Sequence, residues 1–154
     1  MTYSTIQEAM NQGEGQVSVR GWVHRERGSN KIKFVVLRDP SNTIQCILKR
    51  TDFEDKWEDI DHLQVETSIT LTGNIKPEER APTGYEINVT NYEIVGSSEN
   101  YPITKDQSTE FLADNRHLWL RSRKMTAILK IRSTYVQARD EFFKNKKFYR
   151  FDAP

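Results

Sequence analysis

The chain has 154 residues, a length that suits one domain with room for a second small element. Its 23 Lys and Arg residues nearly balance 22 Asp and Glu residues, so the net charge of +1 at pH 7 excludes a histone-like polycation or an acidic tail protein. No apolar run approaches the roughly 18 residues that span a bilayer, and we expect neither a signal peptide nor a membrane partner. One cysteine excludes an internal disulfide framework and favours a cytoplasmic location, and three scattered histidines predict no metal site.

The balanced total conceals a segregation of charge along the chain. Residues 16–50 carry eight basic and two acidic side chains, and residues 116–150 carry eleven basic and two acidic ones. An acidic run over residues 52–66 separates the two blocks. Basic blocks on a neutral chain are typical of a protein that binds a phosphate-bearing partner, although solvated surface charge explains them equally well at this point.

The first two thirds of the chain are predicted to form five short strands. Val17, Val19 and Val23 alternate with polar residues, which is the period of a half-buried strand. Runs of β-branched and aromatic residues, separated by turn residues, continue the pattern. The predicted strands cover residues 16–24, 32–37, 43–48, 65–75 and 85–95.

Helices are predicted before and between these strands. A short helix is expected over residues 2–11. Thr51 with Glu54 three residues later resembles a capping box, and the apolar spacing that follows predicts a helix to about Leu63. Five strands with a helix between the third and fourth are the pattern of an OB-fold barrel. We therefore expect a mainly β fold, an OB-fold barrel followed by a linker and a long C-terminal helix.

Three stretches of the chain resemble the N-terminal part of class II aminoacyl-tRNA synthetases of the aspartyl, asparaginyl and lysyl subgroup. They are "VRGWVHRER" with "IKFVVLRDPSNTIQC" within residues 19–46, "ERAPTGYEINVTNYEIV" at 79–95, and "FLADNRHLWLRSRKMTAILKIRSTYVQARDEFFKNKKFYRFDAP" at 111–154. The segment "RHLWLRS" is more similar to asparaginyl than to aspartyl enzymes. The resemblance implies an anticodon-binding OB domain at 1–95, a hinge at 96–115 and the start of a catalytic domain at 116–154.

The family's motifs 2 and 3, which build the adenylate site, do not occur in these residues. We therefore expect the chain to be part of a larger enzyme and to hold no catalytic residue or cofactor itself. The resemblance implies that the parent is a cytoplasmic asparagine–tRNA ligase that uses ATP and Mg²⁺. An aspartyl-tRNA synthetase, including one that charges both tRNAs, and a free-standing single-strand-binding OB module are the alternatives.

The resemblance assigns five residues to anticodon binding. Phe34 matches the aromatic residue that stacks on the central base, Gln45 matches a glutamine that contacts a base edge, and Glu86 matches the acid that accepts hydrogen bonds from the first-position guanine. Arg25 and Arg27 match basic residues that bind phosphate or a base. The residues alone favour a core position for Phe34, and the other four could be ordinary surface residues.

Four further residues, on the predicted strands or directly after one, have an open or a purely structural interpretation. Trp22 either stacks a base or belongs to the scaffold. Cys46 alternates with Gln45 and should point inward, and the pair Arg38–Asp39 is expected to be structural.

The long helix predicted over residues 123–144 is amphipathic and basic. Its apolar stripe favours packing or dimerisation over RNA binding, because an exposed stripe of large apolar residues needs cover. The resemblance places this helix at the homodimer interface of the parent together with the start of motif 1. The predicted interface residues are Ile128, Ile131, Tyr135, Phe142 and Pro154.

Overall fold

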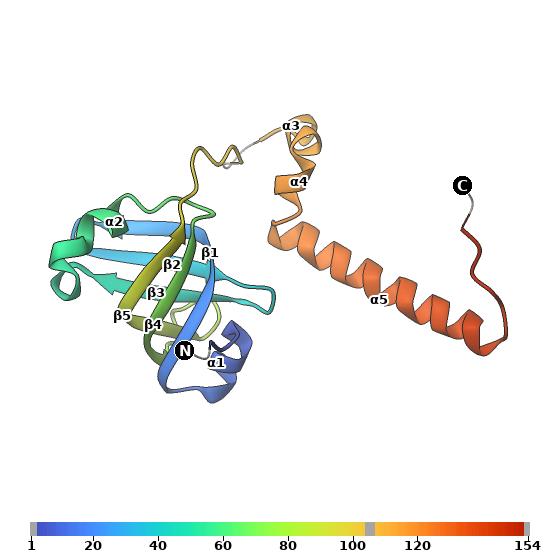
Figure 1. The fold of residues 1–154 in the computed structure, drawn as a ribbon, viewed down its shortest axis with the longest axis horizontal. Helices are drawn as coiled ribbons and strands as arrows, with labels where there is room; N and C mark the ends of the chain where they lie inside the picture. The colour runs from blue at the N-terminus through green and yellow to red at the C-terminus, as the bar shows by residue number, and fades with distance from the viewer. Residues whose placement is uncertain (1–2, 104–106, 153–154) are drawn as a thin grey trace. The chain divides into compact units, whose positions relative to one another are not determined.

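The N-terminal part of the chain is a closed five-stranded barrel (Figure 1). The structure is a computed structural model that describes residues 3–103 and 107–152. The strand order around the barrel is β1-β2-β3-β5-β4, with β3 and β5 parallel and the other neighbours antiparallel. This confirms the predicted OB-fold. The strands are β1 Gly15–Ser29, β2 Ile32–Arg38, β3 Thr43–Lys49, β4 Ser68–Pro77 and β5 Tyr85–Gly96.

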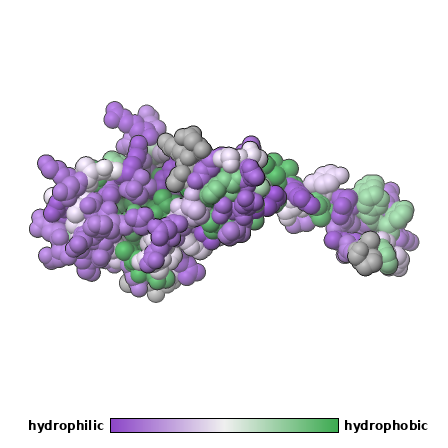
Figure 2. Space-filling model, turned by 90° about the horizontal axis from the view of Figure 1, so that it is seen from above, coloured by the Kyte–Doolittle hydropathy of each residue, from purple (hydrophilic) through white to green (hydrophobic). Residues whose placement is uncertain are grey.

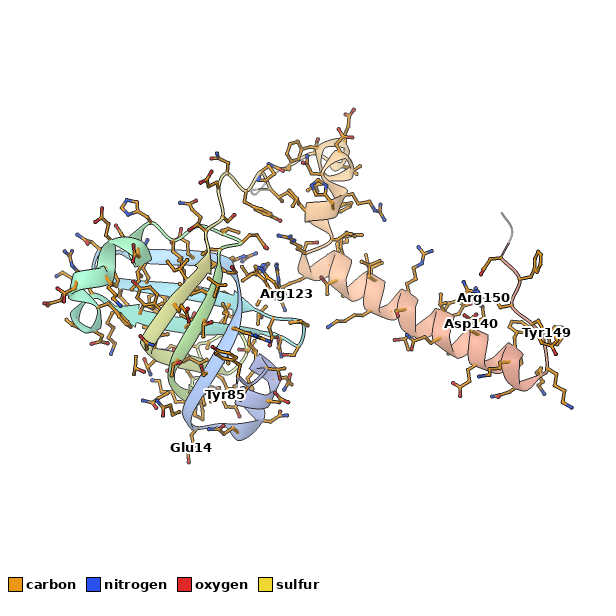
Figure 3. The ribbon with its side chains drawn as sticks, viewed as in Figure 1. Glu14, Tyr85, Arg123, Asp140, Tyr149 and Arg150 are labelled. Atoms are coloured by element: carbon orange, nitrogen blue, oxygen red, sulfur yellow. The ribbon has the colours of Figure 1, made fainter. Side chains whose placement is uncertain are left out.

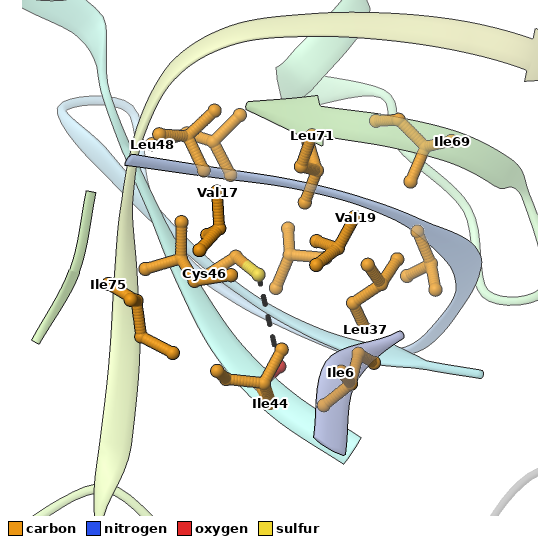
Figure 4. Close-up of a cluster of buried hydrophobic side chains, with 14 of the residues drawn as sticks. Ile6, Val17, Val19, Leu37, Ile44, Cys46, Leu48, Ile69, Leu71 and Ile75 are labelled. Carbon is orange, nitrogen blue, oxygen red and sulfur yellow. Dashed lines mark hydrogen bonds between the residues drawn. The ribbon is translucent and has the colours of Figure 1, made fainter. Parts of the chain in front are cut away.

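Alternating apolar side chains of all five strands fill the barrel. Val19, Leu37, Cys46 and Leu71 are fully buried and converge in its interior (Figure 4). Burial raises the pKa of the Cys46 thiol far above its ordinary value, so this thiol is an inert core group, as its alternation with Gln45 predicts. Each buried apolar side chain of this size contributes roughly 1.5–3 kcal/mol.

Helix α1 (Ile6–Gln12) packs its apolar side against the barrel core through Ile6, which is fully buried. Thr5 and Glu8 form a capping box at its first turn. Asp39, in the turn between β2 and β3, accepts a hydrogen bond of 2.7 Å from the Ile6 N–H. Its other carboxylate oxygen accepts from Ser41, so one side chain shapes the turn and anchors the helix.

The segment between β3 and β4 contains two 3₁₀ turns, η1 (Arg50–Asp52) and η2 (Glu54–Lys56), and the short helix α2 (Trp57–Asp61). The prediction that Thr51 caps a helix is wrong, because Thr51 lies inside η1 and its hydroxyl contacts Asp52. A helix does stand between the third and fourth strands, as predicted, but it is shorter. Trp57, Ile60 and Phe53 bury their side chains against the barrel.

Three strands match the predicted bounds within one residue, and the other two, β1 and β4, differ by more. Strand β1 continues to Ser29 because it pairs with β2 up to the two-residue hairpin turn. Strand β4 begins at Ser68 rather than residue 65 because Glu66 adopts a left-handed conformation with φ of 69°. The Glu66 carboxylate accepts from the guanidinium of Arg38 at 2.9 Å, whereas the Asp39 carboxylate accepts from Ile6, Ser41 and Asn42.

The described residues divide into two units, with the boundary between Tyr101 and Pro102. The second contains α3 (Thr109–Asp114), α4 (Arg116–Trp119) and α5 (Arg123–Asn145). Helix α3 lies within the range 96–115 predicted as a hinge, and α5 matches the predicted long helix within one residue. Near its end Asp140 pairs with Arg150 at 3.1 Å (Figure 3). None of the described helices is long and apolar enough to cross a membrane.

Candidate nucleic-acid interface

Phe34 lies on the outside of the barrel. On β2, Val35 and Leu37 point into the core and are 1% and 0% exposed. Successive side chains of a strand point to opposite faces, so Phe34 faces outward, where it is half-buried. The core interpretation of Phe34 is therefore wrong, and its ring is placed on the surface.

The strand registers bring residues of five strands into one row across this outer surface. Arg25 pairs with Val36, Val36 with Gln45, Gln45 with Glu86, and Glu86 with Lys76. Gln45 stands between two core residues of β3 and therefore faces outward like Phe34. Four of the row's members carry polar side chains.

A chain of hydrogen bonds links the polar members of this surface. The Arg27 guanidinium donates to Gln45 Oε1 at 3.4 Å, and Gln45 Nε2 donates to Glu86 Oε2 at 3.4 Å. Lys76 Nζ donates to Glu86 Oε1 at 3.0 Å. Gln45 and Glu86 are only 7% and 5% exposed, and buried polar groups of this kind are stable only when they have partners.

Arg27 also covers the aromatic ring. Its guanidinium carbon lies 5.3 Å from the centroid of Phe34, directly across the β1–β2 pair. This is a cation–π contact, worth about 0.5–1 kcal/mol at an exposed site. Arg25 is exposed two residues away on the same strand. The structure thus brings together four of the five residues assigned to anticodon binding, and places Arg25 beside them.

Lys76 belongs to this surface but was missed by sequence reasoning. The hydrogen bond it donates to Glu86, together with the negative charge there, raises the pKa of Lys76. The signal that could have found it is positional. Lys76 and Glu86 flank the Pro/Gly-containing loop at 78–84, so a β4–β5 hairpin brings them together.

The surface combines an aromatic ring, an amide, a carboxylate and cations within one patch, which we name the reading face: Arg25, Arg27, Phe34, Gln45, Lys76 and Glu86. Rings of this kind stack unpaired bases, amides and carboxylates bind base edges, and cations bind phosphate. In the view of Figure 2 most of the visible surface of the molecule is hydrophilic, and apolar residues appear in smaller areas. The described residues hold no cluster of His, Cys, Asp or Glu suited to a metal ion.

A groove lies elsewhere on the outside of the barrel. Tyr3, Arg20, Trp22 and Val95 line a groove of about 550 Å³, with the Arg20 guanidinium 5.2 Å from the Tyr3 ring. Trp22 is 41% exposed there and lies apart from the network on Gln45 and Glu86.

On α5, the predicted interface residues are exposed within the described part of the chain. Ile131 and Tyr135 have exposed fractions of 71% and 68%. Ile128 and Phe142 are also exposed, and Phe142 makes an edge-to-face contact with Phe143. Pro154 lies outside the described residues.

Comparison with known proteins agrees with this geometry. Residues 17–95 match the family described as OB-fold nucleic acid binding domain, of the tRNA anticodon type. The chain is 45% identical over 140 residues to an asparagine–tRNA ligase of Thermoplasma acidophilum, and 42% identical over 149 residues to one of Streptococcus pyogenes. Each match covers 90% of this chain and 33% of the relative, so the chain spans about a third of the length of these relatives.

A solved structure is similar in fold. The asparaginyl-tRNA synthetase of Pyrococcus horikoshii, solved with asparaginyl-adenylate, superposes with a TM-score of 0.86 and 28% identity. The match covers 100% of this chain and 37% of that one. The predicted resemblance to asparaginyl-tRNA synthetases is thereby confirmed, and the chain belongs to the tRNA anticodon family of OB-fold nucleic acid binding domains.

Proposed function

We propose that the reading face binds the anticodon of a tRNA, and that the chain supplies this contact as the N-terminal part of an asparaginyl-tRNA synthetase. The observation that carries the proposal is the juxtaposition of Phe34, Gln45 and Glu86 on the outside of three adjacent strands. The names of the relatives, asparagine–tRNA ligases, support the choice of substrate.

Each residue has a role that follows from its chemistry. The Phe34 ring stacks the central base, and the Gln45 amide donates to and accepts from a base edge. The Glu86 carboxylate accepts from N1–H and the N2 amino group of guanine at the first position. Arg25 and Arg27 bind phosphate oxygens, which fixes the position of the loop without reading its sequence.

The parent enzyme would join asparagine to its tRNA through an aminoacyl-adenylate, with ATP and Mg²⁺ as its cofactors. None of the residues of this chain is assigned to ATP or Mg²⁺. The exposed stripe on α5, with Ile131 and Tyr135, is proposed to pack at the homodimer interface of that parent. An ATP–pyrophosphate exchange assay on this chain should give no signal.

Binding of an anticodon stem-loop RNA tests the proposal. The chain should bind a stem-loop with the asparagine anticodon GUU and should lose affinity as salt rises, because each neutralised phosphate adds roughly −0.7 to −0.9 to the slope of log K against log salt. A stem-loop with A in the first position should bind more weakly. Equal affinity for both RNAs at all salt concentrations would contradict base reading by this face.

The same assay separates asparaginyl from aspartyl specificity. The two anticodons share their first two bases and differ at the third, so a stem-loop with GUC is the matched competitor. Weaker binding of GUC supports an asparaginyl parent. Equal binding of GUU and GUC points to a barrel of the kind that serves both tRNAs.

A further inference from the structure

Lys76 stands at the end of β4 directly opposite Glu86. Their pairing is the second from the hairpin loop at 78–84, and the register runs unbroken from Pro77–Tyr85 to Gly73–Val89. A Cβ at Gly73 would clash with the carbonyl oxygen of Asn88. Glycine at this position therefore allows the close approach of β4 to β5. The hairpin thus places a lysine beside the carboxylate in a defined register.

The Glu86 carboxylate is held from two sides. Its Oε1 accepts from Lys76 at 3.0 Å and its Oε2 accepts from the Gln45 amide at 3.4 Å. The Glu86 side chain is only 6% exposed, whereas that of Lys76 is 48% exposed. A carboxylate this deeply buried requires a charged or hydrogen-bonding partner, and a neutral amide alone compensates a buried charge poorly.

We propose that Lys76 is a positioning residue for the first anticodon base and acts through Glu86. The lysine fixes the plane of the carboxylate, so that its oxygens match the two donors on the guanine edge. Because the ammonium group has three donors and reaches solvent, pairing with Glu86 leaves it able to face the RNA backbone as well. The inference rests on the proposed function, since it assigns Lys76 to the site that Glu86 is proposed to form.

The experiment compares stem-loops that differ in one exocyclic group. Inosine in the first position lacks the N2 amino donor of guanine but keeps N1–H. Affinities for the guanosine and inosine stem-loops are measured with the full chain, with Lys76→Gln and with Lys76→Arg. Lys130→Gln, which removes one lysine charge from α5, controls for a general loss of positive charge.

The unsubstituted chain should bind the guanosine stem-loop more tightly than the inosine one by on the order of tenfold, the scale of one specific base contact. In Lys76→Gln this preference should fall toward unity, and Lys76→Arg should restore it. Lys130→Gln should keep the preference. Thermal melting of each variant shows that it is folded, and the exposed lysine tolerates both replacements on steric grounds.

Two results overturn the inference. If Lys76→Gln weakens both RNAs equally, Lys76 is a phosphate contact and does not position Glu86. If Lys76→Gln binds both RNAs as tightly as the unsubstituted chain does, Lys76 has no role at the site. Absence of any guanosine preference in the unmodified chain is a different failure, because it removes the proposed base reading by Glu86 itself.

Discussion

At the residue scale, the ring of Phe34, which we propose as the stacking platform, is covered by the guanidinium of Arg27. A base that stacks on this ring must displace the guanidinium, which then becomes free to bind a phosphate. The net binding free energy from stacking is therefore reduced by the loss of a weak cation–π contact. The contact between Arg27 and a phosphate forms only in the complex.

Substitution of Phe34 by leucine keeps an apolar side chain but removes the π-face. We expect Phe34→Leu to weaken binding of the GUU stem-loop by about 1–3 kcal/mol, the range measured for base–aromatic stacking. Fluorescence anisotropy with a labelled RNA measures the change. Trp22→Leu, the matched loss of an aromatic ring in the groove beside Tyr3, should leave the affinity unchanged. Unaltered binding by Phe34→Leu would remove the ring from the site.

Asp39 provides a pH-dependent contribution to stability. Partial burial acts to raise the pKa of Asp39, but the hydrogen bonds donated by Ser41, Ile6 and Asn42 outweigh it and hold the pKa below its usual value. A carboxyl whose folded pKa is lowered contributes stability above its unfolded pKa of about 3.9, and this stability is lost as pH falls through the folded value.

We therefore expect Asp39→Asn to destabilise the chain at pH 7 by about 1 kcal/mol, the scale of a helix N-cap. Chemical denaturation of both proteins at pH 7 and at pH 3 or below measures the difference. The difference in free energy of unfolding should narrow at acidic pH, because the Asp39 carboxyl of the unsubstituted chain becomes protonated. A gap that stays constant with pH would show that the charge of Asp39 is not what anchors α1.

Individual residues of the reading face could be assigned from the sequence only through a resemblance. The pattern of β2 leaves open which parity faces inward, because Phe34 and Val35 are both apolar. Lys76 was missed because its proximity to Glu86 follows only when β4 and β5 are paired as a hairpin across the loop at 78–84. Cys46 could be placed inward because it alternates with a polar neighbour.

At the element scale, the connection between β3 and β4 is held to the barrel by Tyr92. Its hydroxyl donates to the carbonyl oxygen of Lys56 at 2.8 Å, and its ring meets Phe53 edge-on at 5.4 Å. Desolvation, with the nearby charge of Asp59, raises the pKa of Tyr92 to about 12. A group whose folded pKa is raised contributes stability below its unfolded pKa, and loses it as pH rises through the folded value.

Tyr92→Phe keeps the ring contact and removes the hydrogen bond. We expect a loss of about 1 kcal/mol at pH 7, measured by chemical denaturation. Between pH 10 and about 12 the difference in free energy of unfolding between the unsubstituted chain and the variant should shrink, since the Tyr92 phenol ionises first in the unfolded state. If the two proteins are equally stable at pH 7, the hydroxyl does not anchor this segment.

The strands could be predicted because apolar and polar residues alternate along them, which indicates the side that faces the core. The helix before β4 was predicted in place but not in length, because Thr51 and Glu54 carry a capping signature that the 3₁₀ turns override. Strand β1 was predicted too short, since Gly28 and Ser29 suggest a turn while pairing with β2 keeps them extended.

At the scale of the whole molecule, the two proposed contact surfaces lie on different units. The barrel carries the reading face, and α5 carries an apolar stripe that is exposed in the described residues. We expect Ile131→Glu to reduce self-association of the chain, because a charge replaces a side chain 71% exposed on this stripe. Sedimentation velocity measures the self-association, and the affinity for the stem-loop should be unchanged. An unaltered oligomeric state would argue against α5 as the interface.

The central claim is that the outer surface around Phe34, Gln45 and Glu86 receives the anticodon bases. NMR chemical-shift mapping with the GUU stem-loop tests it most directly. We expect the largest shifts on the outer faces of β1, β2, β3 and β5, and a stacked base should shift the ring-proton resonances of Phe34. Shifts confined to the groove beside Trp22, or to α5, would contradict it.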